Sequence, residues 1–134
     1  MPQNDGRAKI LMVDDDRDFQ TIVRGWLTPR YDLLSLSNGD GLIEDLAAVD
    51  PQLLLLDVRM PGPDGFKLCA GVRARPRFIG LPILFLTGCS EDEDFVKNLD
   101  AGGTAFLTKP VARKRLLWTI RELLAAAAPI AGAA

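Results

Sequence analysis

Residues 52 to 57 read Gln-Leu-Leu-Leu-Leu-Asp, a run of four leucines that ends on a carboxylate. Continuous apolar sequence of this length is typical of a strand in a parallel sheet, because helices cover both faces of such a sheet. A contribution to folding stability does not readily explain why an aspartate ends this apolar strand. At the edge of the sheet its carboxylate can instead act as a nucleophile or as a metal ligand. We therefore interpret 52–57 as a central strand and Asp57 as a candidate functional residue.

Apolar runs of strand length alternate with segments of helical period along the rest of the chain. In the first such segment, Phe19, Ile22, Val23, Trp26 and Leu27 recur at helical spacing before Pro29. Strands that alternate with helices favour parallel pairing and an α/β fold, here a flavodoxin-like (βα)5 three-layer sandwich of strand order 2-1-3-4-5. The other predicted strands are 8–13, 31–36, 82–87 and 104–108, and the later helices are about 41–48, 65–74, 91–101 and 111–127.

Length and composition indicate one globular domain. The chain has 134 residues, 48% of them hydrophobic and 25% charged. We expect a domain over 8–127, a flexible N-terminus over 1–7 and a flexible tail over 128–134. No apolar run is long enough for a membrane span, and the simplest compartment is the cytoplasm. The net charge of −2 gives no reason to expect nucleic-acid binding, and the arginines of 73–77 read as a solvated loop.

The chain contains no histidine and two cysteines, Cys69 and Cys89. The absence of histidine excludes Ser-His-Asp and Cys-His catalysis, histidine-ligated metals and a role as a phosphohistidine carrier. The two cysteines lack the spacing of zinc ligands, and we interpret both as small buried hydrophobic residues.

Polar residues follow the predicted strands at the edge where ligands bind in such sheets. Asp14 and Asp15 follow the first strand, Asp57 ends the third, Thr87 ends the fourth, and Lys109 follows the fifth. Three carboxylates that converge need a compensating cation, and Mg²⁺ suits oxygen ligands of this kind. Taken singly, the aspartates could cap a helix, a task that Asp16 can perform, and Thr87 and Lys109 could be ordinary surface residues. Together they indicate a site for phosphoryl transfer to a carboxylate.

The motifs that carry these residues resemble the response-regulator receiver family over about 9–126. They are Val13-Asp14-Asp15, the segment from Leu56 to Gly65 (LDVRMPGPDG), Leu86-Thr87-Gly88 and Leu107-Thr108-Lys109-Pro110. The resemblance implies that Asp57 accepts the phosphoryl group in a Mg²⁺-dependent reaction.

By the same resemblance, Asp15 would bind Mg²⁺ directly and Asp14 partly through water, and the backbone carbonyl of Arg59 would complete the protein ligands. Thr87 and Lys109 would contact the phosphoryl oxygens. The donor would be a histidine kinase or a histidine phosphotransfer protein, and the output would go to a downstream protein partner.

Three features depart from the commonest family pattern, and a fourth concerns the output surface. Gly88 follows Thr87 where alanine or serine is usual in the family, and residues 102–105 replace a stretch that is usually more acidic. Phe106 occupies the position where a tyrosine often acts as the conformational switch. On the last helix, Leu117, Ile120 and Leu124 are expected to share the inner face, with Leu116 and Leu123 flanking them. Trp118 then lies on the outer face, near Lys114 and Arg121, as a candidate anchor for a partner or a homodimer.

Two other functions fit parts of the sequence. A pseudo-receiver would keep the fold as a protein-binding module without turnover. A phosphatase would use Asp14 and Asp16, but would leave Asp57 without a role. The receiver interpretation predicts no enzyme activity beyond its own phosphorylation and dephosphorylation. It leaves open the kinase, the pathway, the phosphoryl lifetime, and whether the chain is a stand-alone regulator or a fragment.

Overall fold

A computed structural model describes residues 6–88, 102 and 105–127 of the chain. Within these residues it contains five strands, four α-helices and one short 3₁₀ helix. They are β1 (Lys9–Val13), α1 (Arg17–Leu27), β2 (Asp32–Leu36), α2 (Leu42–Val49), β3 (Leu53–Asp57), α3 (Gly65–Arg73), η1 (Pro76–Phe78), β4 (Ile83–Thr87), β5 (Ala105–Thr108) and α5 (Arg113–Ala127). The helix predicted over 91–101 lies outside the described residues.

The sheet confirms the predicted topology. All four strand pairs are parallel and the order is β2-β1-β3-β4-β5. Because β1 and β3 are neighbours, with Val13 paired to Leu56, the segments that follow these two strands leave the sheet side by side. The predicted elements agree with the observed ones to within two residues at most ends. The last helix begins at Arg113, two residues later than predicted.

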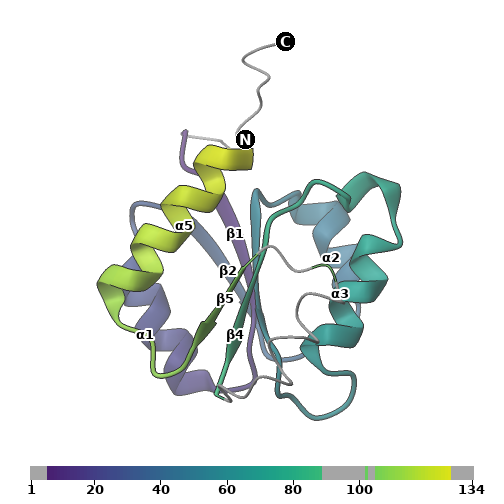
Figure 1. The fold of residues 1–134 in the computed structure, drawn as a ribbon, viewed down its shortest axis with the longest axis horizontal. Coiled ribbons are helices and arrows are strands. Elements are labelled where there is room, and N and C mark those ends of the chain that lie inside the picture. The colour runs from purple at the N-terminus through teal and green to yellow at the C-terminus, as the bar shows by residue number, and fades with distance from the viewer. Residues whose placement is uncertain (1–5, 89–101, 103–104, 128–134) are drawn as a thin grey trace.

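Helices cover both faces of the sheet, as Figure 1 shows: α1 and α5 lie on one side, and α2 and α3 on the other. Alternate leucines of β3 divide between these layers. Leu53 and Leu55 join the core under α1 and α5, and Leu54 and Leu56 join the core under α2 and α3. All four are fully buried, which explains why the strand shows no polar alternation.

The inner face of α5 differs from the prediction by part of a turn. Leu116 and Ile120 are fully buried and Thr119 nearly so, whereas Leu117 and Leu124 are only partly buried at the margin of the core. A helical wheel establishes which residues are neighbours, but packing against the sheet and α1 sets how the helix is rotated. Trp118 points outward, as predicted, with 49% of its surface exposed.

Residues 74–77 are exposed, as the interpretation of 73–77 as a solvated loop predicted, but two arginines of this segment also connect elements of the fold. Arg73 ends α3 and donates to the carbonyls of Gly102 at 2.9 Å and of Phe78 at 2.8 Å. Arg77 lies in η1 and contacts Asp50 at 3.7 Å, next to the end of α2. Both arginines therefore connect elements of the fold. Among the described helices, none is both long and apolar enough to cross a membrane.

Candidate functional site

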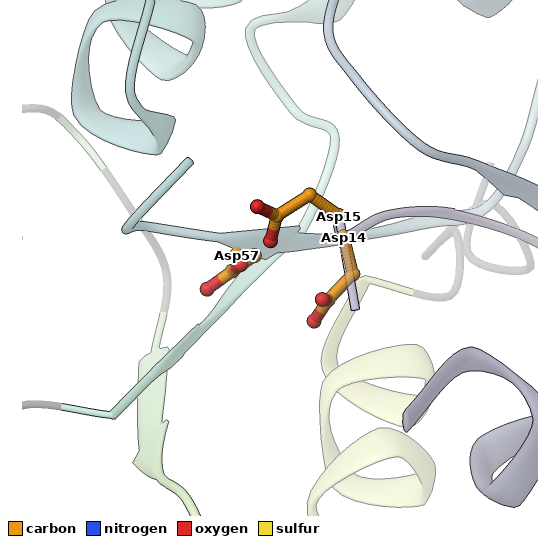
Figure 2. Close-up of side chains that lie close together, drawn as sticks. All are labelled: Asp14, Asp15 and Asp57. Atoms are coloured by element: carbon orange, nitrogen blue, oxygen red, sulfur yellow. The ribbon is translucent and has the colours of Figure 1, made fainter. Parts of the chain in front are cut away.

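Three aspartates meet at the carboxyl ends of β1 and β3 (Figure 2). Asp14 and Asp15 directly follow β1, and Asp57 is the last residue of β3. One carboxylate oxygen from each lies within 4.8 Å of the others. Asp14 and Asp57 are buried and Asp15 is exposed. The convergence predicted from the strand order is therefore present, and it leaves one side of the cluster open to solvent.

Asp14 is held on several sides, although it is fully buried. Its N–H donates to the Leu36 carbonyl at 3.0 Å, and its Oδ1 accepts from the N–H of Asp16 at 2.9 Å. The side-chain amide of Gln20 donates both to the Asp14 carbonyl and, at 3.1 Å, to the Leu36 carbonyl. Sequence reasoning missed Gln20, because a glutamine in the first turns of a helix is ordinary in sequence.

Asp57 is held where α3 approaches the end of β3. A Cβ atom at Gly65 would lie 2.4 Å from the carbonyl oxygen of Asp57, so only glycine permits this approach. Asp64 caps α3 by accepting from the N–H of Lys67 at 2.9 Å. The N–H of Arg59 donates to Oδ1 of Asp57 at 3.4 Å.

The surroundings of Asp57 disfavour its charged form. Burial and the neighbouring Asp14 raise the pKa of Asp57 from 3.8 to about 7, although Lys109 and the Arg59 N–H act in the opposite direction. The pKa of the Asp57 carboxyl therefore lies near 7, and a cation placed beside it would favour its ionised form.

Lys109 and Thr87 complete the cluster from β4 and the end of β5. The Lys109 ammonium lies 2.8 Å from Oδ2 of Asp14 and 3.7 Å from Oδ1 of Asp57. Thr87 is the buried last residue of β4, and its carbonyl accepts from the N–H of Lys109 at 2.6 Å. The strands thus bring an ammonium and a hydroxyl-bearing residue to the same edge as the three carboxylates.

The residues fit a small divalent cation. The donors are carboxylate oxygens, which Mg²⁺ prefers, and the open side at Asp15 leaves room for water or phosphate ligands. Arg59 follows Asp57 in the adjacent loop, where its backbone carbonyl stays a predicted ligand.

Asp16 is engaged in a different task. Its carboxylate accepts from the N–H of Phe19 at 3.1 Å and caps α1, as predicted. It therefore acts in helix capping, which removes the support for a phosphatase pair made of Asp14 and Asp16.

Comparison with known proteins agrees with this geometry. Residues 10–121 match the family model of the response regulator receiver domain. The chain belongs to this family. The receiver domain is 35% identical over 120 residues to the transcriptional regulatory protein GltR of Pseudomonas aeruginosa, covering 89% of this chain and 49% of that protein. It is 38% identical to SpaR of Bacillus subtilis, covering 81% of this chain and 48% of that protein. The chain thus spans about half the length of these curated relatives.

Solved structures give the same result. The chemotaxis protein CheY4 of Vibrio cholerae superimposes with a TM-score of 0.83 at 27% identity, covering 88% of this chain and 99% of CheY4. The BeF3-activated receiver domain of Klebsiella pneumoniae RstA gives 0.79 at 31% identity, covering 87% and 97%. The chain is therefore a signalling module of two-component systems, a family whose receiver domains interact with histidine kinases and downstream effectors.

The remaining predicted residues lie outside the acidic cluster. Phe106 pairs with Phe85 in the sheet register and is half-buried against the core under α2 and α3. The guanidinium of Arg115 lies 5.7 Å from the centre of the Trp118 ring on the outer face of α5. Cys69 is buried, as expected, and Cys89 lies outside the described residues.

Proposed function

We propose that this receiver domain accepts a phosphoryl group on Asp57 in a Mg²⁺-dependent reaction. The observation that carries the proposal is the convergence of three carboxylates within 4.8 Å, with the Lys109 ammonium between two of them. A charge arrangement of this kind has no packing purpose. It matches what phosphoryl transfer to a carboxylate needs, namely positioning and charge neutralisation.

In the proposed reaction, a carboxylate oxygen of Asp57 attacks the phosphorus atom of a phosphohistidine. The new O–P bond forms as the N–P bond breaks, and the imidazole nitrogen keeps the electron pair and takes up a proton. Lys109 and Thr87 would contact the phosphoryl oxygens. Asp14, Asp15, Asp57 and the Arg59 carbonyl would hold Mg²⁺, which supplies charge neutralisation for the phosphoryl oxygens. Later attack of water on the acyl phosphate would return the carboxylate.

The donor is proposed to be a histidine kinase or a histidine phosphotransfer protein, as the family of the chain implies. This fits a chain that has no histidine of its own. A groove of about 410 Å³ beside the cluster supports this partner. Lys109 belongs to its lining, as do apolar residues of α1, so a protein seated there would reach the phosphorylation site. The full lining is Asp16, Phe19, Ile22, Trp26, Lys109, Pro110 and Val111.

Incubation with acetyl phosphate and Mg²⁺ tests the proposal without a partner protein. Intact-mass measurement should show an adduct of about 80 Da that disappears without Mg²⁺. Asp57→Asn should lack the adduct. Asp50→Asn, which changes an exposed aspartate ahead of β3, should keep it. An adduct that persists in Asp57→Asn contradicts the assignment, and a wild-type chain without any adduct favours the pseudo-receiver.

A further inference from the structure

The ring of Phe19 contacts the ammonium group of Lys109 on one side. The ammonium of Lys109 lies 4.4 Å from the centre of this ring, with Asp14 at 2.8 Å and Asp57 at 3.7 Å. Phe19 comes from α1 and Lys109 from the end of β5, so the contact exists only in the folded chain. The ammonium is thus placed by two carboxylates and one aromatic face.

The backbone of Phe19 is held by the same short segment that holds Asp14. The N–H of Phe19 donates to the carboxylate of Asp16 at 3.1 Å, and the N–H of Asp16 donates to Oδ1 of Asp14 at 2.9 Å. The side chain of Phe19 is partly buried and packs against the core under α1 and α5. Asp14 and Phe19 are therefore held close together beside Lys109.

An aromatic ring suits this position for a physical reason. The face of a ring attracts an ammonium through its quadrupole, yet it carries no charge and barely occupies the N–H donors. A third carboxylate would bind Lys109 more tightly and would keep it from a phosphoryl group. An aliphatic side chain would fill the space but would attract no charge. The phenyl ring can hold Lys109 at the site and leave its hydrogen bonds available.

Without the ring, the Lys109 side chain could turn away from the acidic cluster into the neighbouring groove. Both residues line the groove beside the site, and the Lys109 side chain is already 20% exposed. A lysine has four rotatable side-chain bonds, and freedom to turn into the groove would lower the fraction of molecules with the ammonium at the cluster.

From this contact we propose that Phe19 is a positioning residue for Lys109, which it holds over the acidic cluster for the phosphoryl group that Asp57 accepts. The inference rests on the proposed function and adds a residue to it. A purely structural role for Phe19 makes a different prediction, because leucine at position 19 would then serve nearly as well as an aromatic residue.

The first test compares Phe19→Leu with Phe19→Tyr. With Mg²⁺ and beryllofluoride as the phosphoryl mimic, the fluorescence of Trp26, which lines the same groove, reports binding. We expect Phe19→Leu to weaken binding of the mimic, and to slow phosphorylation by acetyl phosphate, by about tenfold. Phe19→Tyr keeps the ring and should stay within about twofold of the wild type.

A matched control is Phe78→Leu. The guanidinium of Arg77 lies 5.4 Å from the centre of the Phe78 ring, so Phe78 also has a cation over its ring. Phe78 belongs to η1, which precedes β4, whereas the acidic cluster lies at the carboxyl ends of the strands. This variant loses a comparable contact and should leave the affinity for the mimic unchanged.

The second test does not depend on phosphorylation. Urea unfolding without Mg²⁺ is measured for the wild type, Phe19→Leu, Lys109→Met and the double variant. The two residues should be coupled by about fivefold in the unfolding equilibrium constant.

Coupling within error of zero overturns the inference, as does equal mimic binding by the leucine and tyrosine variants. If these results occur while the wild type is phosphorylated, only the role of Phe19 fails. If the wild type neither binds the mimic nor accepts a phosphoryl group, the proposed function fails and the inference falls with it.

Discussion

The ammonium of Lys109 lies 2.8 Å from Oδ2 of Asp14, a residue 95 positions away in the sequence. In this arrangement the lysine is closer to Asp14 than to Asp57, which the proposed function makes the phospho-acceptor. Lys109 therefore neutralises the buried Asp14 and acts less strongly on Asp57. Both metal binding and folding stability then depend on the charge that Asp57 carries.

The affinity for Mg²⁺ should rise with pH through about 7. The metal needs the ionised carboxyl, and burial together with Asp14 raises the pKa of Asp57 to about 7. Titration of Trp26 fluorescence with MgCl₂ should give roughly tenfold weaker binding at pH 6 than at pH 8. Equal dissociation constants at the two pH values would show that Asp57 does not limit metal binding.

Folding stability without divalent ions should change in the opposite direction. Between pH 3.8 and about 7 the folded state keeps a proton on Asp57 that the unfolded chain releases. Asp57 therefore contributes stability at low pH, and this contribution is lost as the pH rises through 7. In urea unfolding with EDTA, Asp57→Asn should be roughly 2–4 kcal/mol more stable than the wild type at pH 8, and close to it at pH 4. The exposed Asp50→Asn should not reproduce this difference.

Replacement of Gly65 by alanine should destabilise the fold by about 1–3 kcal/mol and weaken Mg²⁺ binding. The new methyl group would lie 2.4 Å from the Asp57 carbonyl oxygen and 2.9 Å from the Cα atom of Val58, so the backbone at the site must shift. Gly71→Ala in the same helix meets no atom within 4 Å and should be neutral or stabilising. Similar unfolding midpoints for the two variants would contradict the prediction.

Gln20→Met should cost about 1–3 kcal/mol of stability and reduce the affinity for Mg²⁺. The methionine keeps the length of the side chain but leaves the carbonyls of Asp14 and Leu36 without the amide donor. Thr21→Ala, on the exposed side of α1, removes only a hydrogen bond to the preceding turn and serves as the control. Urea unfolding and magnesium titration of both variants measure the difference.

Trp118→Ala should weaken self-association or binding of a downstream partner and leave phosphorylation intact. The ring is 49% exposed beside Arg115, and tryptophan with arginine is a frequent centre of protein interfaces. Sedimentation with and without beryllofluoride should show the loss of self-association, whereas Ile79→Ala, at an apolar residue that is 67% exposed, should not. Unchanged sedimentation of Trp118→Ala, both with and without beryllofluoride, would show that Trp118 has no role in self-association.

The architecture and the membership of the acidic cluster followed from the pattern of residues along the chain. Apolar runs such as 52–57 identify strands locally, and parallel pairing then brings every strand end to one edge, so Asp14, Asp57, Thr87 and Lys109 could be grouped before any coordinates. The capping roles of Asp16 and Asp64 were equally local.

Only the tertiary structure decided which groups touch. The preference of Lys109 for Asp14 and its contact with Phe19 join elements that are distant in sequence. The amide of Gln20 on the Asp14 carbonyl and the close approach of Gly65 to Asp57 join neighbouring elements, but they depend on how a helix packs against the end of a strand. The rotation of α5, which buries Leu116 instead of Leu117, was likewise decided by packing. The physical reason is that periodicity and turn chemistry act over a few residues. Distances of a few ångströms between side chains, and with them the pKa of Asp57, depend on how whole layers pack together.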